Sequence, residues 1–346
     1  MKKIVLIVLL ISFMTVPAKA ADYTAPPVPD SGRDMFPEDA ETFSEGLWMI
    51  MKKAIAQIRP SLSKAAVSCV SLIAISLIVS ILKLIPGATD NVTDLVAALS
   101  IAAILLKPTD TLIRLGAHTV TELSEYGKLL LPVLTGVLAA QGGAVTSSAI
   151  YAGTMVFDAL LGNLIANLIV PLIYFFLCIC AAEAACNQGF LDKLKNFIKW
   201  LMTWGLKIVL YVFTGYMGIT GVVSGTADAA ALKATKLTIS GVVPVVGSLL
   251  ADASESILVG AGVVKSAVGI YGLLAILAVW VGPFLEIGVQ YILLKVTYGV
   301  CDIFSHKRTT KLIKDFSSAM GMLLAMTGTV CLLLLISVVC FIKGVG

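Results

Sequence analysis

The sequence predicts an all-α, polytopic membrane protein with about six to eight membrane helices and short, broken or re-entrant segments between them. Three observations support this fold class. The 346-residue chain is 58% hydrophobic and only 13% charged, whereas ordinary soluble domains have about 25% charged residues. Its mean hydropathy is +0.98. Several apolar runs also reach the length of about 20 residues that a helix needs to cross the hydrocarbon core.

The first 20 residues have the three parts of a secretory signal peptide. Two lysines supply positive charge, an apolar run extends from Ile4 to Val16, and Ala18-Lys19-Ala20 places small residues at the positions that signal peptidase reads. We expect cleavage before Ala21, with an uncleaved N-terminal anchor as the alternative. A cleaved leader would place the next segment on the non-cytoplasmic side.

Residues 21–46 differ from the rest of the chain because they are rich in proline and acidic residues. Such a segment has little apolar surface to bury, and this composition is typical of disorder. We therefore expect an exposed acidic, proline-rich linker at 21–46, followed by a helical membrane domain over 47–346. Leu47–Lys64 is amphipathic and could lie flat at the membrane interface.

Apolar runs of spanning length occur at Ala65–Pro86, Leu201–Val223 and Met320–Ile342. Two shorter runs, 92–106 and 129–140, flank a mixed segment that we interpret as an interfacial or buried amphipathic helix. Because these runs are short of a full span, we expect them to be partly buried or re-entrant.

Two further apolar regions contain a proline. Ile150–Ala185 is long enough for one long helix or two short ones, with Pro171 as the expected break. Farther along, two apolar runs, 267–281 and 284–300, are separated by Gly282-Pro283.

Two lysine- and arginine-rich clusters constrain the topology, since such clusters favour the cytoplasmic side. One lies at 193–199 and the other at 306–314. With the linker outside, an odd number of crossings must separate Ala65 from Leu191. An even number must separate Leu201 from His306, and the last span then returns the C-terminus to the outside. We favour six crossings, and eight remain possible.

The stretch Gly221–Gly272 is rich in small residues and only moderately apolar. Pro244 and Gly247 lie at its centre and disfavour a continuous helix. Irregular backbone at membrane depth survives only where it is buried in protein or lines a watery cavity. The nearby charged residues, Asp252, Glu255 and Lys265, are therefore candidates for a polar seam or aqueous pathway. The alternative is a pair of ordinary loops with solvated charges.

The sequence contains no signature of an enzyme. The phosphate-binding G-x-x-x-x-G-K-[ST], the metalloprotease H-E-x-x-H and the esterase G-x-S-x-G motifs are all missing. The seven cysteines lie in or beside apolar runs, form no C-x-x-C pair and are best interpreted as small apolar residues. We predict no catalytic residue, cofactor or metal site. No basic, aromatic-interleaved stretch indicates nucleic acid binding.

Several motifs together resemble one protein family. Val243-Pro244-Val245-Val246-Gly247 is followed by Asp252 and then by Val264-Lys265-Ser266-Ala267-Val268-Gly269, with Asp228-Ala229-Ala230-Ala231-Leu232-Lys233 upstream. This pattern resembles the stage III sporulation protein AE family of endospore-forming bacteria. The leader, the acidic segment and a last apolar span after a basic loop fit the same family.

The resemblance implies a non-enzymatic, multi-pass subunit of a sporulation channel or secretion-like apparatus in the mother-cell membrane that faces the forespore. It implies other subunits of that complex as partners, including an ATPase and a forespore membrane partner, and a role in forespore development. It supplies no catalytic residue. The first alternative is a stand-alone secondary transporter with a broken-helix site at 241–265. An intramembrane enzyme is a third hypothesis without a supporting motif.

Overall fold

A computed structural model describes residues 24–40, 42–83, 90–186, 189–242, 247–305 and 307–343. For 221–242 and 247–266 it describes the backbone but not the side chains. Within these ranges all regular elements are helices, which confirms the predicted all-α class. The elements are α2 (Asp30–Arg33), α3 (Phe43–Gln57), α4 (Arg59–Leu82), α5 (Asp90–Ala140), α6 (Ala144–Leu164), a π-helix η1 (Ile165–Ile169), α7 (Val170–Cys186), α8 (Gly189–Val242), α9 (Gly247–Asp302) and α10 (Lys307–Lys343).

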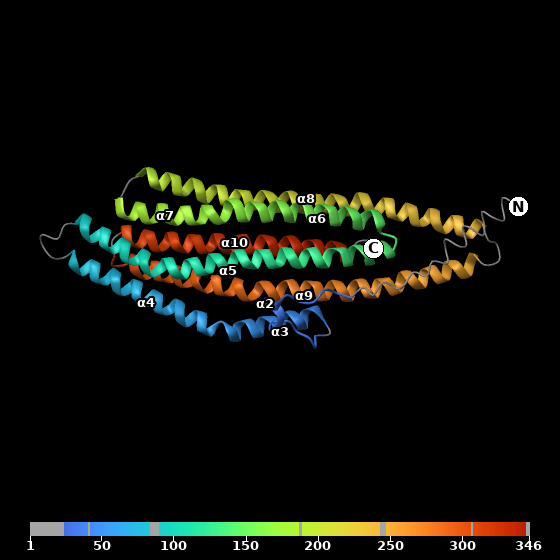
Figure 1. The fold of residues 1–346 in the computed structure, drawn as a ribbon, viewed down its shortest axis with the longest axis horizontal. Coiled ribbons are helices and arrows are strands. Elements are labelled where there is room, and N and C mark those ends of the chain that lie inside the picture. The colour runs from blue at the N-terminus through green and yellow to red at the C-terminus, as the bar shows by residue number, and fades with distance from the viewer. Residues whose placement is uncertain are drawn as a thin grey trace.

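The long helices lie side by side in an elongated bundle (Figure 1). In the described part of the chain, six stretches are long and apolar enough to cross a membrane. They are Arg59–Leu82, Val92–Ala140, Ala144–Ala185, Phe190–Thr220, Ala267–Asp302 and Thr309–Lys343. This number agrees with the six crossings that we favoured from the sequence.

The order of the helices also satisfies the predicted topology. Three candidate spans precede Leu191, and two lie between Leu201 and His306. Since successive helices run in opposite directions, α8 and α10 begin at the same end of the bundle (Figure 1). The two basic clusters therefore lie at one end. That this end faces the cytoplasm stays a prediction.

α5 corrects the expectation of short or re-entrant pieces at 92–106 and 129–140. Both are parts of one 51-residue helix, with Pro108 and Pro132 inside it. An internal proline removes one helical hydrogen bond and favours a kink. Packing outweighs that cost here, because the mixed middle segment still buries an apolar stripe that includes Leu112, Val120 and Leu123.

The predicted break at Pro171 takes another form. The hydrogen bonding changes to a π-helix over Ile165–Ile169, which ends two residues before that proline, and α7 then continues to Cys186. A π turn is a common way for a helix to accommodate a local irregularity. α6, η1 and α7 thus form one long rod. α9 likewise passes through Gly282-Pro283 without interruption.

Several residues of the segment that we expected to be an exposed linker pack against α9, and the linker over 21–46 stays a prediction. Val28 and Met35 are buried, and the ring centroids of Phe36 and Tyr271 are 4.7 Å apart. A Cβ added to Gly32 would lie 2.8 Å from Val279 on α9. A few apolar side chains suffice to fix this acidic segment on α9. The predicted domain boundaries stay predictions.

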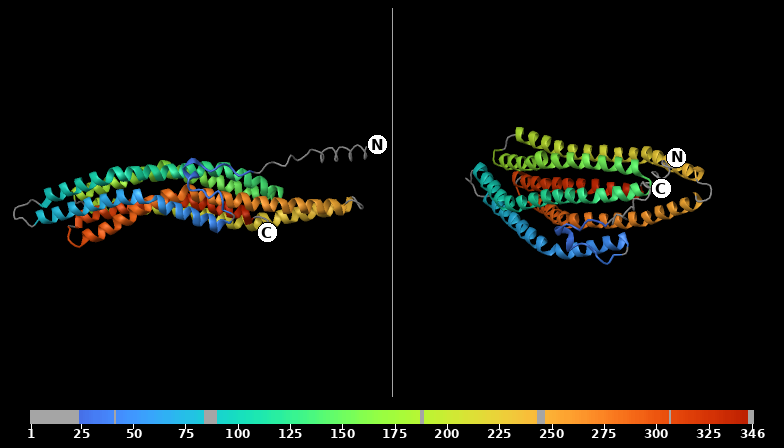
Figure 2. Two further views of the ribbon diagram at one scale, coloured as in Figure 1. Left: turned by 90° about the horizontal axis from the view of Figure 1, so that it is seen from below. Right: turned by 45° about the vertical axis from the view of Figure 1, so that its right-hand side comes forward.

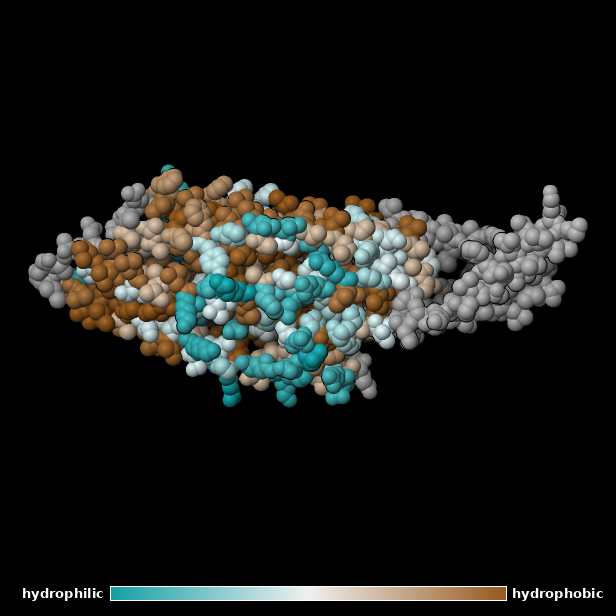
Figure 3. Space-filling model, viewed as in Figure 1, coloured by the Kyte–Doolittle hydropathy of each residue, from teal (hydrophilic) through white to brown (hydrophobic). Residues whose placement is uncertain are grey.

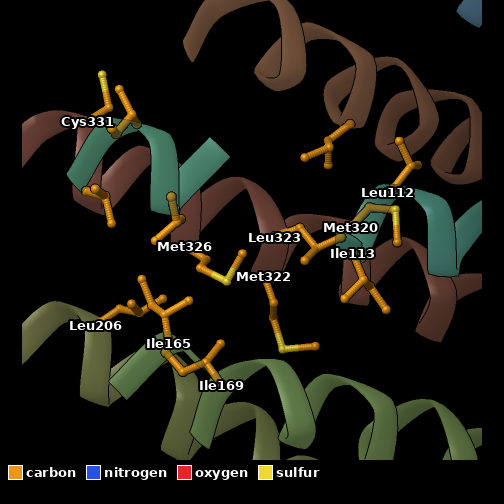
Figure 4. Packing of buried hydrophobic residues seen from close by; sticks show 14 of the residues in the cluster. Leu112, Ile113, Ile165, Ile169, Leu206, Met320, Met322, Leu323, Met326 and Cys331 are labelled. Atoms are coloured by element: carbon orange, nitrogen blue, oxygen red, sulfur yellow. The ribbon is translucent and has the colours of Figure 1, made fainter. Parts of the chain in front are cut away.

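α10 occupies the centre of the bundle and contacts helices on opposite sides. Figure 4 shows Leu112 and Ile113 of α5 beside Met320 and Leu323, while Ile165, Ile169 and Leu206 lie on the other side near Met322. These side chains are all buried or nearly so. The core of the molecule is therefore built around the last helix of the chain.

The bundle is much longer than a membrane is thick. α9 has 56 residues, which corresponds to about 84 Å at 1.5 Å per residue, whereas the hydrocarbon core is about 30 Å thick. The adjoining ends of α8 and α9 extend beyond α6 and the C-terminus (Figure 1, Figure 2). A large part of the protein must therefore stand outside the hydrocarbon.

Candidate functional site

One face of α5 has a row of exposed or half-exposed charged and polar side chains in the middle of the helix. They are spaced three or four residues apart and so share a helix face. We call this row the α5 polar strip, and it consists of Lys107, Asp110, Arg114, His118 and Glu122. Figure 3 shows hydrophilic residues across the middle of this face of the molecule, with hydrophobic residues toward the end where α4 and α5 meet.

Short contacts hold the polar strip in place. Arg114 Nε donates a hydrogen bond to Asp110 Oδ2 at 2.9 Å, and the Tyr174 hydroxyl of α7 donates to Asp110 Oδ1 at 2.6 Å. His118 Nδ1 lies 3.4 Å from Glu122 Oε2. Charges of both signs therefore alternate along the strip.

Two contacts align the polar strip with the neighbouring rod of α6, η1 and α7. Tyr174 reaches Asp110, and Ser124 donates a hydrogen bond of 2.5 Å to Asp158. The rod has no Asp, Glu, Lys or Arg between Asp158 and Glu183, and its exposed side chains there include Leu160, Leu168 and Phe175. Charged and apolar surfaces thus lie side by side at the same level of the bundle.

A polar hollow of about 460 Å³ extends the strip into the groove between α4, α5 and α9. Lys64, Lys107, Glu286 and Gln290 are among the side chains that line it. The buried Nε2 of Gln290 has no hydrogen-bond partner within the described residues. Since buried polar groups are rarely left without a partner, this hollow suits water or a polar group of a neighbouring molecule.

A second polar feature lies near the basic end of the bundle. Lys195 Nζ is 2.6 Å from both Glu183 Oε2 and Asp315 Oδ2. Lys311 Nζ donates to Glu183 Oε1 and lies 3.0 Å from Asp192 Oδ1. This cluster joins α7, α8 and α10. The Lys195 side chain is only 4% exposed, so the cluster is best explained as a structural contact between helices.

The predicted seam falls in a part of the chain that the structure describes only as backbone or does not describe. Pro244 lies outside the described residues, and Gly247, Asp252, Glu255 and Lys265 lie in the part of α9 whose side chains are not described. The seam therefore stays a prediction. The described backbone on either side is helical, with α8 ending at Val242 and α9 beginning at Gly247.

Helix geometry separates the members of that seam. Asp252 and Glu255 are three positions apart and share a face. Lys265 is 13 positions after Asp252 in the same helix, and so about 20 Å farther along the axis.

The polar strip was not identified as a site from the sequence, where its residues were interpreted as an interfacial or buried amphipathic helix. The signal was present in the four-residue spacing of Asp110, Arg114, His118 and Glu122. Whether this spacing marks a site depends on which residues of the rod of α6, η1 and α7 lie beside it, and only the fold shows that. In the described ranges no group of three or more His, Cys, Asp or Glu side chains could hold a metal ion.

Comparison with known proteins gives a consistent result. The family described as stage III sporulation protein AE matches residues 38–344. A relative from Bacillus subtilis (strain 168), named "Stage III sporulation protein AE", is 22% identical over 222 residues, which make up 63% of this chain and 56% of the relative. The matched part therefore spans little more than half of the length of that relative. No solved structure matches the chain.

Proposed function

Because the chain belongs to the stage III sporulation protein AE family, we propose that it is a non-enzymatic membrane subunit of a sporulation channel or secretion-like complex. This complex lies in the mother-cell membrane that faces the forespore and is needed for forespore development. The partners are other membrane subunits, an ATPase that supplies energy and a protein of the forespore membrane.

The α5 polar strip is the observation that supports a subunit of a larger assembly. A Lys, Arg or Asp side chain at the centre of a membrane helix costs about 3 kcal/mol on insertion scales, and such residues generally face protein or water. Lys107, Asp110 and Arg114 lie on the outside of this bundle beside an apolar rod. A neighbouring subunit, or a water path between subunits, would remove most of that cost.

The alternation of charge along the strip suits recognition of a partner helix. Asp110 and Glu122 present carboxylates, and Lys107 and Arg114 present cations. Opposed patterns of this kind determine which partner binds and in which register more than they determine affinity. The adjoining hollow at Glu286 offers further polar contacts. In this mechanism the subunit contributes a membrane platform, and the ATPase performs the energy-consuming chemistry.

The transporter alternative depended on broken helices at 241–265. Broken helices build transport sites because their free ends bind the substrate. α8 and α9 are unbroken to Val242 and from Gly247, so this argument now applies only to the connection between them. We therefore favour the subunit of an assembly.

A charge-neutral double substitution tests the proposal. Arg114→Gln with Glu122→Gln removes one charge of each sign from the polar strip. We expect at least a tenfold loss of heat-resistant spores and loss of co-purifying membrane subunits, with normal abundance in the membrane fraction. A tenfold change corresponds to about 1.4 kcal/mol, which is within the range for one interfacial charge pair.

The matched control is Lys52→Gln with Glu45→Gln, since both residues are exposed on α3, away from the strip. This control should sporulate normally. Normal sporulation and normal co-purification of the Arg114/Glu122 variant would reject the strip as a contact surface.

A further inference from the structure

A cavity of about 700 Å³ lies between α8, α9 and α10, on a different part of the molecule from the polar strip. Three lysines line it, one from each helix: Lys199 of α8, Lys295 of α9 and Lys314 of α10. All three are exposed. No Asp or Glu lines the cavity, so its local charge is strongly positive.

The lysines of the cavity have no carboxylate partner in the described part of the chain. Lys199 Nζ lies 3.3 Å from Ser318 Oγ. Lys295 Nζ is 4.6 Å from the centre of the Tyr291 ring, and Lys314 Nζ is 5.4 Å from that of Tyr298. These weak contacts hold the ammonium groups near the cavity and leave hydrogen-bond donors free. Thr203 and Ser317 add hydroxyl groups to the lining.

The rest of the cavity wall is apolar. Ile169, Met202, Leu206, Met322 and Ala325 line it, and Figure 4 shows Met322, Ile169 and Leu206 in the space between α10 and the neighbouring helices. A small hydrated anion would gain no favourable contact from this apolar wall. A ligand with a negatively charged head and a hydrocarbon tail would contact both parts.

The position of the cavity also favours a lipid. The cavity lies near the ends of α8, α9 and α10 that hold the basic clusters, and its lining residues belong to four candidate membrane spans. Basic pockets between membrane helices on the cytoplasmic side are typical sites for anionic lipid head groups. Each lysine near the membrane surface contributes about 1 kcal/mol toward an anionic lipid.

We propose that this cavity binds one anionic phospholipid. The phosphate is held by Lys199, Lys295 and Lys314, and an acyl chain lies along the wall formed by Leu206, Met322 and Ala325. The ligand class is a phosphodiester lipid with a net negative head group, such as phosphatidylglycerol. The site is independent of the partners proposed for the polar strip.

Native mass spectrometry of the full-length protein in detergent tests this site with phosphatidylglycerol as the probe and phosphatidylcholine as its neutral counterpart. We expect one tightly retained phosphatidylglycerol and little phosphatidylcholine. The triple variant Lys199→Gln/Lys295→Gln/Lys314→Gln should bind phosphatidylglycerol about a hundredfold more weakly, since three such contacts sum to roughly that factor. Lys193→Gln/Lys207→Gln/Lys52→Gln has the same change in net charge at exposed lysines outside the cavity and should bind normally.

A second variant tests the apolar part without altering charge. Gly299 lines the cavity, and a Cβ added there would meet nothing within 4 Å. Gly299→Phe should therefore fold normally but occupy the space of the acyl chain and weaken lipid retention about tenfold. Gly288→Phe is the control, because a Cβ at Gly288 is equally free and lies outside the cavity.

Three results would overturn the proposal. Retention of phosphatidylglycerol by the triple lysine variant at the wild-type level would show that the three lysines do not form a phosphate site. Equal retention of phosphatidylcholine would show that head-group charge is not recognised. Displacement of the lipid by millimolar glycerol phosphate, with Gly299→Phe behaving like wild type, would indicate a small-anion site instead.

Discussion

The Lys195 ammonium donates hydrogen bonds to carboxylates on two other helices, and it does so while almost completely buried. A buried ion pair adds little stability compared with an apolar replacement of the whole cluster, because both charges lose their hydration. Removing only one partner is different, since it leaves unpaired charge in a medium of low polarity. Lys195 therefore matters chiefly because Glu183 and Asp315 are already present.

At this scale we expect Lys195→Met to be among the most damaging single substitutions. It leaves the carboxylates of Glu183 and Asp315 without their shared cation and should reduce the free energy of unfolding by about 3–5 kcal/mol. Thermal unfolding of the purified protein in detergent would measure the loss. Lys193→Met, at an exposed position two residues away, should change stability little. Equal stability of Lys195→Met and Lys193→Met would contradict a structural role for the cluster.

At the scale of the elements, the long helices differ in how closely they approach. α6 and α8 meet at Gly153, where an added Cβ would lie 2.0 Å from Cε1 of Tyr216. The Tyr216 hydroxyl also donates to the backbone oxygen of Ala149 at 3.0 Å. Small residues allow membrane helices to pack closely. The ring of Tyr216 thus occupies the space that a side chain at position 153 would need.

We therefore expect Gly153→Ala to separate α6 from α8 and to cost about 1–3 kcal/mol, the usual range for overpacking. Protease resistance and thermal unfolding in detergent would report the change. Gly162→Ala is the matched control in the same helix, since a Cβ there meets nothing within 4 Å. Adding Tyr216→Ala should recover part of the loss. A Gly153→Ala protein as stable as the Gly162→Ala protein would disprove the close contact.

At the scale of the whole molecule, an alternating bundle of six candidate spans determines which connections lie on the same side. α5 ends at Ala140 on one side, and α9 ends at Asp302 on the other. The end of α8 at Val242 and the start of α9 at Gly247 lie on the same side as Ala140, because one rod of helix separates each from the basic end. From the length of α9 we expect its start at Gly247 to lie outside a hydrocarbon core of about 30 Å.

Cysteine labelling tests this arrangement in a variant whose seven native cysteines are replaced. Ala140→Cys and Ser254→Cys should react with a membrane-impermeant maleimide in intact cells. Asp302→Cys should react only after permeabilisation, because positive charge holds its end of the bundle in the cytoplasm. Labelling of Asp302→Cys in intact cells would reverse the topology. Protection of Ser254→Cys would place the end of the α8–α9 hairpin inside the membrane.

The amino-acid sequence alone predicted a lipid environment, the helical class and the family, and it favoured six crossings while eight remained possible. The environment, the helical class and the favoured crossings follow from composition, from the length of apolar runs such as Met320–Ile342 and from the positions of lysine clusters, all of which are local. The family follows from motifs such as Val243-Pro244-Val245-Val246-Gly247. The tertiary structure alone decided that α5 is continuous through Pro108 and Pro132, because packing on neighbouring helices offsets the lost hydrogen bonds. It also decided which charged residues lie beside an apolar surface, as Asp110 of α5 does where Tyr174 of α7 contacts it. Which residues lie at the same level of the bundle, and which helices lie side by side, depends on contacts between helices distant in the chain. No local sequence pattern encodes these contacts.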